Sequence, residues 1–139
     1  MLRQSSTELL IRARRAGLHE FTDRVREFVG DSGMQDGLLT LFCRHTSASL
    51  LIQENAAPAA RRDLERYFAR VAPESRDYEH DDEGPDDMPA HLRTALTATQ
   101  LSIPVQGGRL ALGTWQGIYL FEHRRDTPER RVALHLIGE

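Results

Sequence analysis

The sequence has no lysine, because all 18 of its basic residues are arginines. A Schiff-base mechanism on a lysine and the lysine of a Walker phosphate loop are therefore excluded. Any anion must be held by arginine, whose planar guanidinium group suits phosphate and carboxylate groups. The alternative explanation is genome composition, which removes lysine without any role in function.

Cysteine and long apolar runs are also scarce. Cys43 is the one cysteine, which excludes an internal disulfide and a four-cysteine zinc site. We interpret it as a small core residue in a reducing compartment. No apolar stretch reaches the ~20 residues of a membrane span, and the N-terminus shows no signal-peptide pattern. We expect a cytoplasmic protein with no membrane partner and a single domain over residues 1–139.

The acidic residues are concentrated in one segment. Eight of the 21 lie between Glu74 and Asp87, where Arg76 is the only basic residue. The rest of the chain then has 13 acidic residues against 17 arginines, and a mildly basic body attracts small anions. The arginines are too scattered and the aromatic residues too few to indicate nucleic-acid binding. The acidic segment is too polar to pack, and we expect a loop.

The hydrophobic pattern predicts an α+β fold dominated by antiparallel sheet. Helices are expected where apolar residues recur at helical spacing, at 21–33, 55–72 and 88–98. About seven strands are expected, at 7–14, 37–44, 48–53, 100–105, 109–113, 114–124 and 130–138. The pair Gly107-Gly108 predicts a tight hairpin between two of them.

Finer predictions concern the helix starts and one strand. The predicted helix N-caps are Thr22, Asn55 and Asp87. The strand 114–124 alternates in polarity, with Trp115 on the same face as two further aromatic residues. We therefore predict that Trp115 is buried and that Gln116 faces a pocket or a neighbouring backbone.

Four of the six histidines lie among polar residues. His45 leads a run of hydroxyls that includes Ser47, and His80 lies among the carboxylates of the acidic segment. His91 lies in the first turn of a predicted helix, and His123 follows a glutamate at a strand end. If the acidic loop folds over the hydroxyl run, these side chains converge. By contrast, we read His19 as a solvated loop residue and His135 as a packing residue.

Such a set of histidines has the composition of a metal site. Three histidines, or two histidines and a carboxylate, hold a catalytic zinc or similar ion with one position open. The carboxylates could instead hold magnesium together with a diphosphate. Hydroxyls and the free N–H groups at the start of the 55–72 helix also suit a phosphate. The alternatives are a solvated charge run and a polar turn.

Three blocks of sequence carry a family resemblance. The blocks HTSASLLIQENA (45–56), DDMPAHLRTAL (86–96) and GRLALGTWQGIYLFEHR (108–124) resemble the YjbQ-like family, also called the secondary thiamine-phosphate synthase family. Their order and spacing match along nearly the whole chain. The resemblance implies β-sandwich-like sheets with two to three short helices, assembly as a homotrimer, and a polar pocket near the subunit interfaces.

The resemblance also implies a weak thiamine-phosphate synthase activity on a small phosphorylated metabolite. In that reaction an aminopyrimidine methyl diphosphate is joined to the nitrogen of a thiazole phosphate. The expected catalytic residues are His45, Glu54 and His91. The expected binding residues are Ser47, Asn55, Thr114, Gln116 and Arg124. The expected ligands of a divalent metal, zinc or magnesium, are His45, His80, His91 and His123.

Two other functions fit the same residues. A metal-dependent hydrolase of a phosphorylated metabolite would use the histidines to activate water. A trimeric module that binds a metal or ligand would need no catalysis. Metal content without turnover favours the module, and phosphate release without a coupling partner favours the hydrolase.

Overall fold

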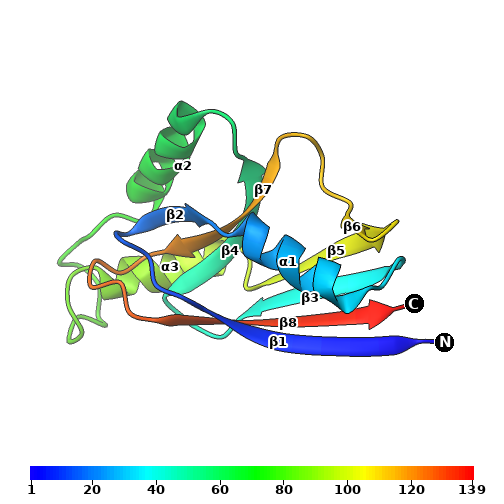
Figure 1. Cartoon of the computed structure of the whole chain (residues 1–139). Coiled ribbons are helices and arrows are strands. Elements are labelled where there is room, and N and C mark those ends of the chain that lie inside the picture. Colours follow the sequence, from blue (N-terminus) through cyan, green and yellow to red (C-terminus); the bar gives the residue numbers. More distant parts are fainter.

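The computed structural model describes residues 1–139, which form two antiparallel sheets and three helices (Figure 1). The larger sheet has five strands in the order β1-β8-β3-β5-β6. β1 and β8 pair along their whole length, from Arg3 opposite Gly138 to Ile11 opposite Arg130. These strands are β1 (Arg3–Ile11), β3 (Gly37–Cys43), β5 (Gln100–Gln106), β6 (Arg109–Leu110) and β8 (Arg130–Gly138).

The smaller sheet has three strands in the order β2-β7-β4. They are β2 (Gly17–Glu20), β4 (Ala48–Glu54) and β7 (Gln116–Glu122). The register of β4 and β7 places Ala48 opposite Glu122 and Glu54 opposite Gln116. The two ends of this strand pair are therefore six residue steps apart, or about 20 Å.

The main hydrophobic core unites 17 buried residues from both sheets and from α1 (Thr22–Ser32). Leu39, Leu134 and Leu120 are fully buried in it. α1 contributes Val25 and Val29, which lie at helical spacing on its buried face. Gly33 ends this helix with a φ of 69°, a left-handed conformation that favours glycine.

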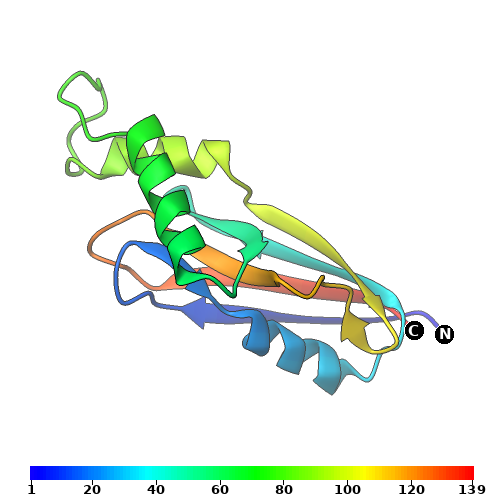
Figure 2. The ribbon, with the colours of Figure 1, turned by 90° about the horizontal axis from the view of Figure 1, so that it is seen from above.

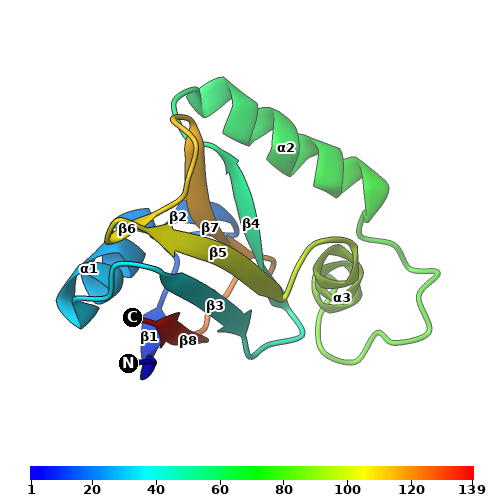
Figure 3. The same cartoon turned by 90° about the vertical axis from the view of Figure 1, so that its right-hand side faces the viewer.

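The other two helices lie on the side of the smaller sheet (Figures 2 and 3). α2 (Pro58–Val71) has no buried residue, and it packs through Leu64 and Phe68 against a small cluster that includes Tyr119. α3 (Asp87–Leu96) lies against β4, and the Thr97 hydroxyl just beyond it donates to Ser49 Oγ at 2.6 Å. None of the three helices is long and apolar enough to span a membrane.

The structure confirms the α+β class, the three helices, the buried Cys43 and the hairpin at Gly107-Gly108. The acidic segment forms a loop, since neither helix nor strand occurs between Val71 and Asp87. In Figure 3 this loop extends away from the sheets before it returns to the start of α3. Its return brings the polar residues of the loop to the first turn of that helix.

Several finer predictions were wrong. Trp115 is 62% exposed, because it lies just before the first residue of β7. The residues of β7 from Gly117 to Glu122 are buried on both faces of the strand, and Trp115 is not part of that packing. His19 lies in β2, not in a loop. The helices begin one or more residues away from the predicted caps, at N-cap residues Phe21, Ala57 and Asp86, and none of these three side chains makes a capping hydrogen bond.

Candidate metal-binding site

The acidic loop and α3 bring two histidines onto one carboxylate. His80 Nε2 lies 2.8 Å from Asp87 Oδ2, and His91 Nε2 lies 3.2 Å from the same oxygen. Asp87 and His91 are four residues apart on α3, so they share one face of the helix. The ligand atoms of the three residues all lie within 4.8 Å of one another. A single ion could contact all three.

Asp87 lies in the first turn of α3, where the positive end of the helix dipole favours a carboxylate. Its side chain is only 6% exposed, whereas the side chains of His80 and His91 are 43% and 33% exposed. The carboxylate thus forms the floor of the site, and the two imidazoles form a rim that solvent can reach.

The charged groups of the cluster stabilise one another in their ionised forms. The hydrogen bond to Asp87 raises the pKa of His80, and the nearby carboxylates of Asp82 and Glu83 act in the same direction. Burial alone would raise the pKa of Asp87, but the hydrogen bond from His80 and the charges of His91 and Arg124 hold it below its usual value. The carboxylate is therefore ionised, and a metal would compete with a proton for His80.

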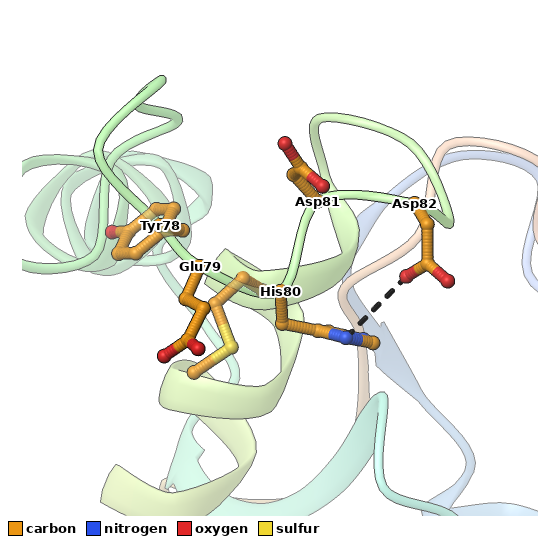
Figure 4. Close-up of a pocket in the computed structure, with 6 residues that line it drawn as sticks. Tyr78, Glu79, His80, Asp81 and Asp82 are labelled. Carbon is orange, nitrogen blue, oxygen red and sulfur yellow. Dashed lines mark ion pairs between the residues drawn. The ribbon is translucent and has the colours of Figure 1, made fainter.

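A hollow of about 720 Å³ lies beside His80, and it is lined by Tyr78, Glu79, Asp81, Asp82 and Met88 (Figure 4). The figure shows the His80 ring directed toward Asp82, and an ion pair of 3.5 Å joins His80 Nδ1 to that carboxylate. A space of this size lies in the range of small-molecule sites. Two imidazole nitrogens and one carboxylate oxygen next to it leave coordination positions for water or substrate.

His45 and Ser47 lie at a different hollow, lined by residues 42–47 and Thr99. His45 Nε2 accepts a hydrogen bond from the backbone N–H of Arg131 at 2.7 Å, so the neutral ring carries its proton on Nδ1. Burial and the charge of Arg130 lower the pKa of His45, which keeps the ring neutral. Within one chain His45 is a hydrogen-bond acceptor, and it lies apart from the cluster around Asp87.

His123 is buried in the interior, only 2% exposed, and lies outside the cluster around Asp87. Its Nε2 lies 2.9 Å from Ser49 Oγ, and its Nδ1 has no partner. Burial lowers its pKa to about 3, so it is neutral at physiological pH. In this chain His123 is a buried hydrogen-bonding residue, without solvent access for an ion.

Four further predicted residues, Glu54, Asn55, Thr114 and Gln116, lie at the far end of the β4–β7 pair. Glu54 Oε2 accepts the N–H of Ala57 at 2.8 Å, and Asn55 Nδ2 donates to Glu20 Oε2 at 3.1 Å. Gln116 Oε1 accepts the N–H of Gly113 at 2.8 Å, and Thr114 is exposed beside it. These groups lie about 20 Å from the His123 end of the same strands. One chain alone does not join them to His80 and His91.

Asp87 was not singled out as a metal ligand, because the sequence assigned it a capping role and otherwise counted it only among the carboxylates of the acidic segment. The signal that could have found it is the spacing Asp87-x-x-x-His91 within a predicted helix, which places both side chains on one face.

Comparison with known proteins gives consistent matches along the chain. The family model described as UPF0047 protein YjbQ-like matches residues 7–139. A UPF0047 protein of Synechocystis is 50% identical over 99% of this chain and 94% of its own length. The UPF0047 protein YjbQ of Escherichia coli O157:H7 is 45% identical over 94% of this chain and 96% of its own length.

Solved structures agree with these matches. A YbjQ-like protein of unknown function from Sulfolobus solfataricus superposes with a TM-score of 0.91 at 25% identity, and the match covers 100% of both chains. An uncharacterized conserved protein of the YjbQ/UPF0047 family from Clostridium acetobutylicum has a TM-score of 0.84 at 32% identity, over 92% of this chain and 97% of that one.

Proposed function

The chain belongs to the UPF0047 protein YjbQ-like family, and from this premise we propose that it binds a divalent metal ion and acts on a small phosphorylated metabolite. The observation that carries the proposal is the cluster of His80, Asp87 and His91, whose ligand atoms lie within 4.8 Å of one another. Two imidazoles favour zinc or a similar transition metal over magnesium, which prefers oxygen ligands.

The reaction that we propose is a slow thiamine-phosphate synthase type of transfer. The thiazole nitrogen forms a bond to the methylene carbon of the aminopyrimidine, and the carbon–oxygen bond to diphosphate breaks, with the electron pair leaving on the diphosphate. A bound divalent ion would offset the charge on that leaving group. The hollow beside His80 has room for a phosphorylated substrate next to the cluster.

The distant group at Glu54 and Gln116 is consistent with an assembly of several copies. Since about 20 Å separates the two ends of the β4–β7 pair, this group can serve the metal cluster only if it comes from another copy. Trp115, which is exposed next to Gln116, is a large apolar residue of the kind enriched in interfaces. We therefore propose a homotrimer with sites near its interfaces.

The test is an assay with metal-loaded protein, the pyrimidine diphosphate and the thiazole phosphate, with thiamine phosphate as the measured product. His91→Ala is the test variant, and His135→Ala, on the exposed side of β8, is the matched control. We expect product with the wild type and the control and at least a tenfold loss with His91→Ala.

Other outcomes would change the proposal. Phosphate release without thiamine phosphate would support a metal-dependent hydrolase, a function that the open side of the cluster also permits. Metal binding without turnover of either kind would leave a metal-binding module. Equal product with His91→Ala would remove the cluster from the reaction.

A further inference from the structure

The side chain of Arg124 is already committed to protein partners. Its Nη1 donates to Asp87 Oδ1 at 2.5 Å, and its Nη2 donates to the carbonyl oxygen of Glu83 at 2.8 Å. Its Nε lies 3.3 Å from Asp86 Oδ2. The side chain is 20% exposed. A guanidinium group held in this way is a poor candidate for a free phosphate-binding residue, which is the role that the sequence suggested for it.

The two oxygens of Asp87 have separate partners. Oδ1 accepts from Arg124, whereas Oδ2 lies between His80 and His91. We propose that Arg124 is a positioning residue of the metal site, which holds Oδ1 so that Asp87 presents Oδ2 alone to an ion shared with the two histidines. This inference rests on the proposed metal binding and names a residue that acts on the ion only through Asp87.

The backbone that carries Arg124 is itself fixed. Glu122 Oε2 accepts the N–H of Arg124 at 3.0 Å. The same glutamate, only 1% exposed, accepts from Arg130 Nε at 2.7 Å and from Arg130 Nη2 at 2.5 Å. On the other side, the N–H of Arg125 donates to Asp86 Oδ2 at 2.9 Å. The buried ion pair at the end of β7 thus fixes the backbone from which the guanidinium group reaches the acidic loop.

The hydrogen bond from Arg124 to Asp87 Oδ1 affects which metal ion the site prefers. Calcium sites use several oxygens and often bidentate carboxylates, whereas zinc takes one oxygen or nitrogen from each ligand. With Oδ1 occupied by Arg124, Asp87 supplies a single oxygen next to two imidazoles. The arrangement favours zinc or cobalt over calcium, and hydrogen bonds to metal ligands of this kind raise metal affinity about 10- to 100-fold.

The experiment measures zinc affinity by calorimetry and the visible absorption of bound cobalt in the full chain. The variants are Arg124→Gln, which removes the charge, and Arg124→Lys, which retains it. Arg15→Gln is the matched control, because Arg15 makes a comparable pair with Glu65, with nitrogen–oxygen distances of 2.9 and 3.0 Å, away from the acidic loop. Thermal unfolding without metal shows whether each variant is folded.

We expect Arg124→Gln to weaken zinc binding about 10- to 100-fold and to change the cobalt spectrum. Arg124→Lys should restore part of the affinity, and Arg15→Gln should bind like the wild type. If Arg124 contributes only to stability, the cobalt spectrum of the folded Arg124→Gln variant will equal that of the wild type. An unchanged cobalt spectrum, or a zinc affinity equal to that of the wild type, overturns the inference. Absence of metal binding in the wild type overturns the proposed function itself.

Discussion

Two histidines of this chain have opposite environments. His123 is buried next to Ser49 with its pKa lowered from 6.5 to about 3, whereas the hydrogen bond to Asp87 raises the pKa of His80. A neutral buried histidine stabilises the folded state fully above pH 6.5. As the pH falls from 6.5 toward 3, the unfolded chain takes up a proton that folded His123 does not, so stability is lost.

We therefore predict that His123→Gln has a weaker dependence of unfolding free energy on pH than the wild type between pH 7 and 4. Urea denaturation at each pH measures the difference. The control is His135→Gln, since His135 is exposed on β8, and its profile should follow the wild type. Parallel profiles for His123→Gln and the wild type would show that His123 takes up its proton equally in both states.

Glu122 and Glu65 form a second contrast between residues. Glu122 is paired with Arg130 in the interior, whereas Glu65 is paired with Arg15 near the surface. Removing one partner of a buried pair costs about 3–5 kcal/mol, and an exposed pair contributes about 0–1 kcal/mol. We predict that Glu122→Gln lowers the unfolding free energy by about 3–5 kcal/mol and Glu65→Gln by about 1 kcal/mol or less. Similar losses in urea denaturation would contradict this assignment.

The candidate site was predictable from the sequence only in part. His45, His80, His91 and His123 were all expected to converge, and within one chain only His80 and His91 lie together, where the acidic loop meets the start of α3. His123 followed a carboxylate, but its burial depends on β4 and α3 packing over it, which local sequence does not reveal. Arg124 was assigned to phosphate because its engagement with the acidic loop is a long-range contact.

At the scale of elements, two glycines have different backbone conformations, and a side chain added at either one would make no steric clash. Gly30 lies within the helix α1, whereas Gly107 lies in the β5–β6 turn with a φ of 58°. At either position an added Cβ would have no atom within 4 Å. Alanine in a helix gains about 0.5–1 kcal/mol over glycine, whereas alanine in a left-handed conformation costs about 1–2 kcal/mol.

We predict that Gly30→Ala raises the melting temperature and that Gly107→Ala lowers it. Differential scanning calorimetry of the two variants beside the wild type measures both shifts. A rise for both variants would show that the turn does not require the left-handed conformation at Gly107.

Elements with strong local signals were predictable. The three helices and the Gly107-Gly108 hairpin follow from apolar spacing and turn residues. β2 was missed because it has four residues and pairs only with β7. Trp115 was misplaced because alternation suggested one buried face. In fact Ile118 and Leu120 pack in the main core, whereas Tyr119 packs in the cluster under α2.

At the scale of the whole molecule, we predict that the protein is a trimer. The single chain leaves Trp115 exposed and its two groups of polar residues about 20 Å apart along β4 and β7. Light scattering at micromolar concentration should give about three times the chain mass of 15.8 kDa. A mass equal to one chain would contradict the assembly and leave Glu54 and Gln116 without a part in the metal site.

The central claim is that His80, Asp87 and His91 hold one divalent ion. The most direct measurement is anomalous diffraction at the zinc edge from crystals grown with zinc. We predict a peak within about 2.0–2.2 Å of His80 Nε2, His91 Nε2 and Asp87 Oδ2, with Arg124 still bonded to Asp87 Oδ1. A zinc-saturated crystal with no peak among these three atoms, and with His80 still hydrogen-bonded directly to Asp87, would contradict the claim.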